Sequence, residues 1–506
     1  MIWLLLSIVI PFLSALACLV TSSRPVLNRY IGIGGSFLLL LASILLLGDV
    51  VRSDFVILQG GSWPAPFGIT LVADIFSALM VAITGIVAVS ISIYSLQDVD
   101  NALLKKHYFA LLHFLLMGVN GAFLTGDLFN LYVWFEVMLI ASFVLITLDG
   151  KCDQLEGGVK YLIINLLSSI LFLSGVGLLY GKLGTLNMAD IASRLAASQD
   201  ALLINSSAML LLAAFSIKAA LFPFFFWLPA SYHTPRVVIS ALFAGLLTKV
   251  GVYALIRSYT LIFSSHFSEV QGILLVLAAG TMISGVLGAA AQFNIRRILS
   301  FHIVSQIGYM VMGLAIGGTL AIAGAIFYII HHIVVKTNLF LIGGLIAQRA
   351  GSGDLKKIGG LYKATPYLAL LFLIPALSLG GIPPLSGFWA KFSVIKAGLD
   401  GEHYLLVTAA LLVGILTLYS MTKIWNEAFW KEPVDGANAP SPERKLSLAA
   451  VIPCVFLAAI TLILGFWSAP LLELSFAASE QLLNPERYIE SVLNLTDHED
   501  TIAMAE

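Results

Sequence analysis

Long apolar stretches recur along the whole chain and are separated by short polar connections. Most of them reach about twenty residues, the length that an α-helix needs to cross the hydrocarbon core of a bilayer. No stretch alternates between apolar and polar positions as the strands of a membrane β-barrel do. The pattern therefore predicts an all-α polytopic membrane protein.

Fourteen such segments can be counted. They lie near residues 2–20, 30–49, 72–95, 107–125, 128–148, 158–180, 204–230, 237–261, 270–292, 297–317, 320–347, 366–397, 403–428 and 447–470. The one long hydrophilic connection, residues 429–446, is rich in proline, glycine and charge. Beyond residue 471 we expect a short amphipathic helix with an acidic end.

Proline interrupts two of these segments in comparable ways. The prolines are Pro223 and Pro229 in the seventh segment, and Pro375, Pro383 and Pro384 in the twelfth. In each segment a tryptophan, Trp227 or Trp389, follows a proline by four or five residues. Proline removes a helical hydrogen bond, and a membrane tolerates the freed carbonyl only where protein or water satisfies it. Two broken helices five segments apart indicate two inverted five-helix repeats, segments 4–8 and 9–13.

This pattern divides the chain into four parts. Residues 1–106 hold the first three helices, residues 107–261 the first repeat, and residues 270–428 the second repeat. Residues 429–506 hold a cytoplasmic loop, the fourteenth helix and an acidic tail.

Charge bias predicts the orientation of the chain in the membrane. Seventeen lysines and arginines fall on one set of connections and six on the opposite set. Because Lys and Arg favour the cytoplasmic side, the richer set should be cytoplasmic, and both termini should lie outside. The first apolar stretch lacks a basic leader and a small-residue cleavage site, so we interpret it as the first membrane helix.

Composition excludes several function classes. Of the 506 residues, 59% are hydrophobic and 11% are charged, against about 25% charged in soluble domains, so little soluble mass is present. A net charge of −1 gives no sign of a nucleic-acid partner. Three scattered cysteines match no disulfide or metal spacing, and no nucleotide, redox or haem motif occurs. No cofactor is predicted, so the energy must come from an ion gradient or a partner.

Five charged residues lie deep inside apolar segments. They are Glu136, Lys218, Lys249, Lys336 and Lys391. A charge at the bilayer centre costs at least about 2.5–3.5 kcal/mol, so such residues usually face the protein interior and serve a function. One or two of them could extend to the membrane surface, but all four lysines together are not expected to.

The chemistry that these residues favour is proton transfer. Burial disfavours a charged lysine, whereas a neighbouring carboxylate favours it. A lysine that approaches and leaves Glu136 would therefore bind and release a proton. Helical spacing alone does not bring Glu136 to Lys218, because the two residues lie on different segments.

Histidines add candidates for proton relay. His331 and His332 precede Lys336, and His332 shares a helix face with that lysine. His302 lies on the tenth segment near two hydroxyl groups, those of Ser305 and Tyr309. The competing interpretation of a lone membrane histidine is an interhelical hydrogen bond. For His302 and for His113 we give this interpretation the same weight as a role in proton relay.

Other polar residues have simpler interpretations. Adjacent histidines point to different helix faces and no third ligand is spaced for binding, so no metal site is predicted at His331 and His332. Asp74 is expected to form hydrogen bonds at a helix end. Asp127 and Arg257 are expected to lie at the membrane interface.

These charged motifs resemble a known family. DLFNLYVWFEVMLIASF with Glu136, the broken helix with Lys218, the segment with Lys249, the HH–x3–K run and GGIPPLSGFWAKF with Lys391 resemble the proton-conducting antiporter-like membrane subunits. Such subunits occur in respiratory complex I, in membrane-bound hydrogenases and in multisubunit Mrp cation/proton antiporters. The resemblance covers roughly residues 70–430 and is greatest to the D subunits of the Mrp antiporters.

The resemblance implies fourteen helices, two inverted repeats and a hydrophilic axis along the membrane plane. It implies that Glu136 partners Lys218, that Lys249 bridges the halves, that His332 and Lys336 form a relay, and that Lys391 ends the axis. One complex I homologue type carries glutamate at that last position, so Lys391 argues against that type.

The resulting expectation is a proton-translocating subunit of an Mrp-type Na⁺/H⁺ antiporter in a bacterial inner membrane, working with other subunits. A sodium site needs several oxygen ligands and Glu136 is the only deep carboxylate, so Na⁺ is expected to be handled elsewhere in the complex. The nearest alternative is a proton-pumping subunit of an NADH:quinone oxidoreductase or hydrogenase. A purely structural scaffold is disfavoured, because it has no use for five buried charges.

Overall fold

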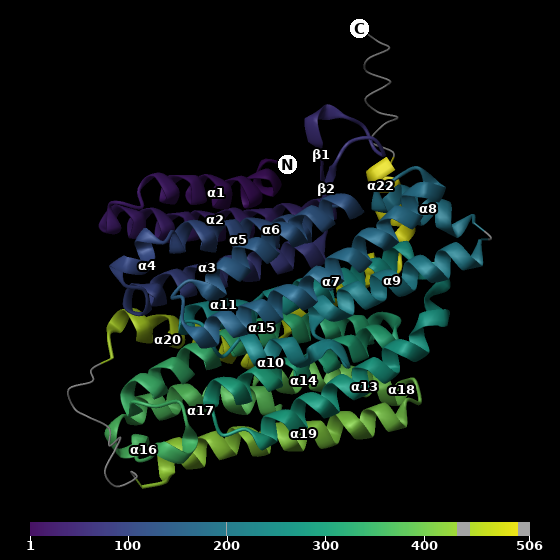
Figure 1. The fold of residues 1–506 in the computed structure, drawn as a ribbon. Coiled ribbons are helices and arrows are strands. Elements are labelled where there is room, and N and C mark those ends of the chain that lie inside the picture. The colour runs from purple at the N-terminus through teal and green to yellow at the C-terminus, as the bar shows by residue number, and fades with distance from the viewer. Residues whose placement is uncertain (199, 433–445, 494–506) are drawn as a thin grey trace.

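Helices run through almost all of residues 1–198, 200–432 and 446–493, which are the residues that the computed structural model describes (Figure 1). The helices of the first half are α1 (Ile2–Val20), α2 (Pro25–Ser53), α3 (Ile75–Asp98), α4 (Asn101–Lys105), α5 (Tyr108–Leu124), α6 (Leu128–Thr147), α7 (Cys152–Leu183), α8 (Met188–Ala196), α9 (Ala201–Ala219), α10 (Trp227–Ser231), α11 (Val237–Gly245) and α12 (Leu247–Arg257).

The second half is also mainly helical. Its helices are α13 (Phe267–Ala291), α14 (Ile295–Ile316), α15 (Gly318–Ala350), α16 (Leu361–Ala364), α17 (Pro366–Gly380), α18 (Ser386–Asp400), α19 (Tyr404–Trp425), α20 (Leu448–Phe466), α21 (Ala469–Leu483) and α22 (Pro485–Leu493). Strands β1 (Val56–Gln59) and β2 (Thr70–Ala73) form an antiparallel hairpin between α2 and α3.

Apolar helices of membrane-spanning length confirm the prediction of an all-α polytopic membrane protein. Within the described residues, twelve helical stretches are long and apolar enough to cross a bilayer, and α5 and α17 are shorter apolar helices. The count of fourteen crossings and the inverted repeats stay predictions.

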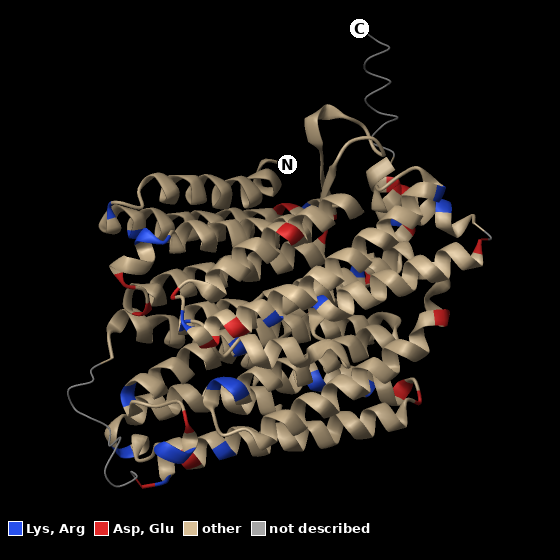
Figure 2. Ribbon diagram, viewed as in Figure 1, with Lys and Arg blue, Asp and Glu red and all other residues tan. Residues whose placement is uncertain are grey.

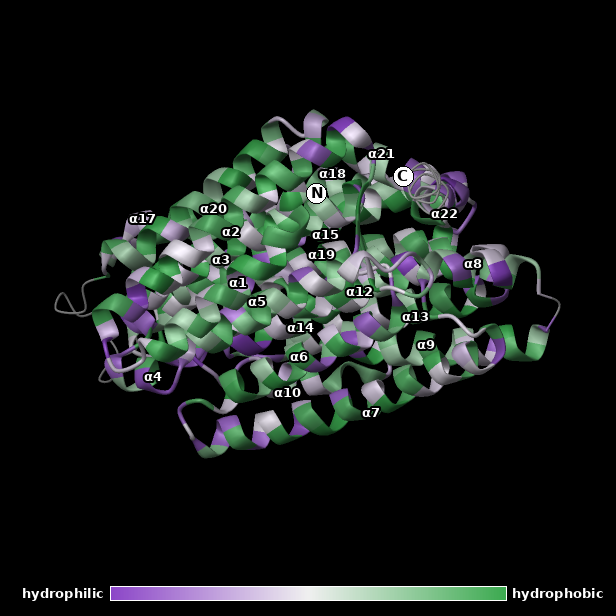
Figure 3. Ribbon diagram, turned by 90° about the horizontal axis from the view of Figure 1, so that it is seen from above, coloured by the Kyte–Doolittle hydropathy of each residue, from purple (hydrophilic) through white to green (hydrophobic). Residues whose placement is uncertain are grey.

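The spanning helices lie side by side, with α1 and α2 along one edge of the bundle and α19 along the opposite edge (Figure 1). Most charged residues gather at the two ends of the bundle, and a smaller number lies along its middle (Figure 2). Between the ends, the helices are dominated by hydrophobic residues (Figure 3). Such a distribution suits an apolar surrounding between two polar boundaries.

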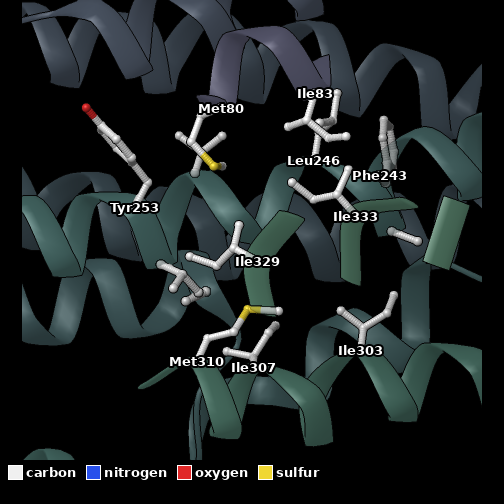
Figure 4. Close-up of a cluster of buried hydrophobic side chains, with 14 of the residues drawn as sticks. Met80, Ile83, Phe243, Leu246, Tyr253, Ile303, Ile307, Met310, Ile329 and Ile333 are labelled. Atoms are coloured by element: carbon white, nitrogen blue, oxygen red, sulfur yellow. The ribbon is translucent and has the colours of Figure 1, made fainter. Parts of the chain in front are cut away.

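Four spans form the core of the bundle. In their most apolar stretches, the share of residues that are buried is 89% in α3 and in α11–α12, 94% in α14 and 83% in α15. In the other candidate spans this share is 39–50%. Side chains from these four spans, among them Met80, Phe243, Ile307 and Ile333, interdigitate at the centre (Figure 4). A polar group on these spans is therefore shielded from any surrounding lipid.

Helix starts follow capping signals in the sequence. Asp74 caps α3 in a reciprocal capping box with Ser77, which confirms its predicted role at a helix end. Asp127 caps α6 and Asn294 caps α14, each accepting from backbone N–H groups of the first turn. These caps set where the helices that carry functional residues begin.

The break in the seventh segment has its backbone groups satisfied by neighbours. Helix α9 ends at Ala219, and the next residue, Ala220, lies in the left-handed region at φ 59°. The Trp227 indole N–H then donates to the Ile217 carbonyl at 3.1 Å. The Phe222 N–H donates to the Thr281 hydroxyl at 2.9 Å. This arrangement meets the requirement that freed backbone groups find protein partners.

The twelfth segment is broken between α17 and α18 in a different way. Gly381 lies at φ 89°, where a side chain would be strained. Trp389 does not cap a carbonyl of its own broken helix, because its indole N–H donates to Gly465 of α20 at 2.9 Å. The matching Pro–Trp spacing of the two segments therefore gives different contacts.

Segment eight is also interrupted, which the apolar pattern does not predict. Helix α11 ends at Gly245 and α12 begins at Leu247, with Leu246 between them at φ −109°. A Cβ at Gly245 would meet the Thr337 hydroxyl of α15, so α11 and α15 pack closely at this point.

The C-terminal part differs from the expected single amphipathic helix. Two helices, α21 and α22, follow α20, and α21 packs against α15 and α3. Residues 433–445 of the predicted loop and residues 494–506 of the predicted acidic tail lie outside the described residues.

Candidate functional site

The six predicted site residues lie on helices that cross the bundle. Their positions are Glu136 on α6, Lys218 on α9, Lys249 on α12, His332 and Lys336 on α15, and Lys391 on α18. Lys249, His332 and Lys336 are fully buried, and Lys391 is 7% exposed. The core spans therefore carry the middle of this set and the outer spans carry its two ends.

Glu136 and Lys218 face a shared region but do not touch. The Ser169 hydroxyl donates to the Glu136 carboxylate. The Lys218 ammonium donates to the Asn165 carbonyl at 3.5 Å and lies 5.6 Å from the centre of the Phe135 ring. The two charges interact electrostatically, yet they form no ion pair within 4 Å in the described part of the chain. In this structure the predicted partners Glu136 and Lys218 are therefore near each other without a direct hydrogen bond or ion pair.

Glu136 is only partly buried. Val133 and Ile140, one turn before and one turn after it on α6, are 38% and 65% exposed. Because residues three and four apart share a helix face, Glu136 lies at the border of the outward face of α6, where Ser169 of α7 still reaches its carboxylate.

Lys218 and Lys249 lie on two tightly packed helices. A Cβ at Gly251, two residues after Lys249, would lie 2.6 Å from the backbone nitrogen of Ala219 and 2.9 Å from the carbonyl carbon of Lys218. Only glycine permits this approach of α12 to α9. The contact connects the first pair of charges with the core of the bundle.

Lys249 is held by the unexpected break in segment eight. Its ammonium donates to the carbonyl of Ala244, close to the end of α11. The carbonyls in the last turn of a helix lack intrahelical partners, so the lysine satisfies a group that the break exposes. No acidic side chain pairs with Lys249 within 4 Å among the described residues.

His332 and Lys336 form the centre of the second half. The Lys336 ammonium donates to the Leu299 carbonyl of α14 at 3.2 Å. His332 lies within electrostatic range of Lys249, Lys336 and His302. Both ring nitrogens of His332 and of His302 have no hydrogen-bond partner in the described part of the protein. Buried polar atoms are almost always paired with protein or with ordered water. The ring nitrogens of His332 and His302 are therefore expected to bind water.

Lys391 occupies the second broken helix. Its ammonium donates to the carbonyls of Leu379 and Gly380 at 3.0 and 3.1 Å, at the end of α17. It also lies 5.2 Å from the centre of the Tyr309 ring. Lys391 thus caps the break in this segment, the task that Trp227 performs in the seventh.

The secondary relay candidates have varied surroundings. The His331 ring nitrogen Nδ1 lies 2.8 Å from the Ser386 hydroxyl at the start of α18. The Tyr309 hydroxyl donates to the Ala410 carbonyl, and the Ser305 hydroxyl is buried without a partner in the described residues. His113, by contrast, lies 2.9 Å from the Gly32 carbonyl, which is the interhelical hydrogen bond that we weighed for it.

The four lysines share one solution to burial. Each ammonium donates to a backbone carbonyl, and none pairs with a carboxylate within 4 Å in the part of the chain that the structure describes. A carbonyl accepts a hydrogen bond from a charged or a neutral lysine. The arrangement can therefore hold a lysine before and after it loses a proton.

A buried ion pair lies outside this set. The Arg257 guanidinium is 2.5 Å from the Asp74 carboxylate and lies against the rings of Tyr253 and Tyr488. Arg257 is 6% exposed and is the last residue of α12, so its guanidinium is enclosed by protein, and its predicted place at the interface stays a prediction. The Tyr488 ring of α22 covers the Arg257 guanidinium.

Two cavities flank the contact between α7 and α10. The larger, about 410 Å³, lies at the end of the bundle where α7 and α14 begin, and Glu156, Lys160, His233 and Arg297 line it. Burial, and then the nearby Arg297, lower the pKa of His233 to about 4. The smaller cavity, about 20 Å³, lies beside Lys218. We name the larger cavity the vestibule.

Comparison with known proteins gives one consistent family. Residues 125–417 match the model of the membrane domain described as NADH:quinone oxidoreductase/Mrp antiporter. The D subunit of the Na⁺/H⁺ antiporter of Alkalihalophilus pseudofirmus is 47% identical over 489 residues, which cover 97% of this chain and 99% of that protein. The corresponding protein of Bacillus subtilis is 40% identical over 494 residues, with 97% and 99% covered.

Two solved structures have the same fold. A chain of the Mrp complex from a Dietzia species superposes with a TM-score of 0.91 at 34% identity, over 97% of this chain and all of that chain. A chain of the membrane-bound sulfane sulfur reductase, an archaeal respiratory membrane complex, also superposes with a TM-score of 0.91, at 25% identity over 97% and 99% of the two chains.

Proposed function

Because the chain belongs to the NADH:quinone oxidoreductase/Mrp antiporter family, and within it to the D subunits of Na⁺/H⁺ antiporters, we propose that it conducts protons along a buried axis. The axis runs through Glu136, Lys218, Lys249, His332, Lys336 and Lys391. The chain is thus a transporter subunit, and it works beside other subunits in a multisubunit antiporter.

The observation that carries this proposal is the way in which the lysines are buried. A lysine kept charged for structural reasons would be expected beside a carboxylate, because an unpaired buried charge is costly. Here the acceptors are backbone carbonyls, and the ring nitrogens of the neighbouring His332 and His302 have no hydrogen-bond partner among the residues that the structure describes. Groups that bind and release protons fit this pattern.

The gap between Glu136 and Lys218 supplies a switch. Lys218 now lies by Asn165 and the Phe135 ring. Movement of its flexible side chain towards Glu136 would favour the charged lysine, and return to the Asn165 carbonyl would favour release of a proton. The charge on Lys218 then biases Lys249 on the adjacent helix.

The outward position of Glu136 supports a partner at this face. A carboxylate facing hydrocarbon is strongly disfavoured. Another subunit of the antiporter would cover this face of α6 and shield the carboxylate. A membrane-spanning neighbour with a polar group opposite Glu136 satisfies this requirement.

We place the complex in a bacterial inner membrane, with both termini of this chain on the outer side. The connections at the α4 and α16 end carry most of the basic residues and would face the cytoplasm. Na⁺ would cross elsewhere in the complex, since Glu136 is the only carboxylate of the proposed axis and a cation site needs several oxygen ligands.

The test is Na⁺-dependent ΔpH in membrane vesicles containing the whole complex. Glu136→Ala and Lys218→Ala should each abolish antiport, while the other subunits still co-purify with the variant. Lys182→Ala, at an exposed ion pair with Asp200, serves as a matched control and should keep antiport. Normal antiport in either axis variant would disprove the proposed pathway.

The second candidate is a subunit that pumps protons when a redox partner drives it. The shared fold with a chain of the archaeal respiratory complex supports this candidate. The sequence identity to that chain is 25%, however, whereas the identity to the antiporter protein is 47%. Co-purified subunits distinguish the two, because iron–sulfur or flavin subunits would support the redox complex.

A further inference from the structure

The small cavity beside Lys218 has the size of one water molecule. Its volume is about 20 Å³, and a cavity of about 10–15 Å³ or more holds a single water. Lys218, Asn165, Tyr161 and Tyr232 are the polar residues that line it. A water is stable in such a space only where two to four polar partners surround it, and these side chains supply them.

Tyr232 carries the strongest sign of a missing partner. Its side chain is fully buried, and its hydroxyl has no hydrogen-bond partner among the described residues. Leaving a buried hydroxyl unpaired costs about 1–3 kcal/mol. The neighbouring Tyr161 hydroxyl lies 2.6 Å from the Ser142 hydroxyl and interacts electrostatically with Tyr232.

Lys218 is also only weakly held. Its single hydrogen bond among the described residues is to the Asn165 carbonyl at the long distance of 3.5 Å, although an ammonium can donate three. We propose that Tyr161 and Tyr232 hold one water molecule against Lys218, and that this unit passes protons between Lys218 and the vestibule. The proposal rests on the proton pathway proposed above and assigns it an entrance.

The position of this unit supports the role. Helices α7 and α10 contribute to the lining of both the small cavity and the vestibule. On α7, Gly157 faces the vestibule and Tyr161, one turn later, lines the small cavity. On α10 and its end, Pro229 faces the vestibule and Tyr232 lines the small cavity. Because residues three and four apart share a helix face, the two tyrosines lie about one helical turn from the residues that line the vestibule.

Transfer through the unit needs no stable tyrosine anion. The water accepts a proton on one oxygen lone pair and gives up one of its own on the other side. A tyrosine hydroxyl does the same, since it is both donor and acceptor. After each transfer the hydroxyl turns back, and the net result is one proton moved between the vestibule and the Lys218 amine.

Tyr232→Phe tests the proposal, because it removes only an oxygen that has no protein partner among the described residues. If Tyr232 were merely part of the packing, this change would leave the protein as stable or more stable and antiport unaltered. We expect the maximal rate of Na⁺-dependent antiport to fall by at least about tenfold, with the half-saturating Na⁺ concentration and the thermal stability of the complex unchanged.

Tyr259→Phe is the matched control. Tyr259 is also buried, but its hydroxyl donates to the Ala208 carbonyl at 2.6 Å and does not line the cavity. This variant should lose stability and keep the wild-type antiport rate. Equal antiport rates in Tyr232→Phe and wild type would overturn the proposal.

Two further outcomes separate this inference from the pathway itself. If Lys218→Ala abolishes antiport and Tyr232→Phe does not, the pathway stands and only the entrance is wrong. If Lys218→Ala keeps antiport, the pathway fails first. A density map of the intact complex that resolves other buried waters and shows this cavity empty would also overturn the inference.

Discussion

The Lys249 ammonium donates to the backbone carbonyl of Ala244, close to the end of α11. This relationship joins a charged side chain to a break in its own segment. It repeats at Lys391, whose ammonium donates to the carbonyls of Leu379 and Gly380 at the end of α17. In both places the lysine ammonium supplies a donor to a helix-end carbonyl, and the carbonyl supplies an acceptor to the ammonium. The apolar side chains around them supply neither.

Replacement of Lys249 by methionine tests whether this lysine does more than cap a helix. Lys249→Met keeps the length of the side chain and removes the amine, so we expect antiport in vesicles to be lost while the complex assembles. The control is Lys423→Met, since Lys423 also donates to two helix-end carbonyls, those of Ala290 and Gln292, each at 2.7 Å. That variant should lose stability and keep antiport. Equal activity of the two variants would show that Lys249 is only a cap.

The close approach of α12 to α9 makes a second prediction. Gly251→Ala would place a Cβ 2.6 Å from the Ala219 backbone nitrogen and push the helices that carry Lys249 and Lys218 apart. We expect antiport to fall by at least about tenfold, because small displacements strongly slow a positioned transfer. Gly177→Ala on α7, where nothing lies within 4 Å of the new Cβ, should be neutral or stabilising by about 0.5–1 kcal/mol. Vesicle antiport and thermal unfolding of the purified complex measure both effects, and full activity of Gly251→Ala would contradict the argument.

The buried pair of Asp74 and Arg257 predicts a particular pattern of stability. Arg257→Met leaves the Asp74 carboxylate buried without its partner, which should cost about 3–5 kcal/mol. Asp74→Asn retains a good N-cap for α3, so adding it to Arg257→Met should restore much of the loss. Thermal unfolding of the detergent-solubilised complex compares the single and double variants. A double variant as unstable as the single one would mean that the unpaired charge is not the cause.

Asp127 makes stability depend on pH in a defined direction. Burial raises the pKa of this carboxyl to about 6 from its ordinary value of 3.8, although backbone N–H groups of Asn130 and Phe129 act in the opposite sense. A raised carboxyl pKa stabilises the fold fully below the unfolded value, and this contribution is lost as pH rises through the folded value. Between about pH 4 and pH 6 the wild type should therefore lose up to about 3 kcal/mol that Asp127→Asn does not lose.

The measurement for Asp127 is the difference in unfolding temperature between variant and wild type. Asparagine caps a helix as well as aspartate, so the cap itself is kept. The variant should gain on the wild type as the pH is raised from about 4.5 to about 7, the range that spans the two pKa values. A constant difference across this range would contradict the raised pKa.

Sequence alone predicted those features that depend on residues near each other along the chain. The helices follow from apolar length, the break after Lys218 follows from Pro223, and the cap at Asp74 follows from its place before an apolar run. Each is decided by local backbone chemistry. The presence of five charges in apolar segments is likewise evident from the order of residues along the chain.

What the sequence did not predict depends on distances between helices. The ends of α12 and α3 had to be placed together before Arg257 could be known to pair with Asp74. The break between Gly245 and Leu247 is not evident in the apolar pattern, and neither is the close packing of Gly245 against Thr337 of α15. The hydroxyl of Tyr232 does not stand out in the sequence, because a tyrosine near a helix end usually reaches water.

The outward carboxylate of Glu136 has a consequence for the life of the protein in the cell. A newly inserted copy that has not met its neighbour carries this group on a face otherwise made of residues such as Val133 and Ile140. Because a carboxylate in contact with lipid is costly, such a copy should be less stable in the membrane than one whose α6 face is covered by a neighbouring subunit.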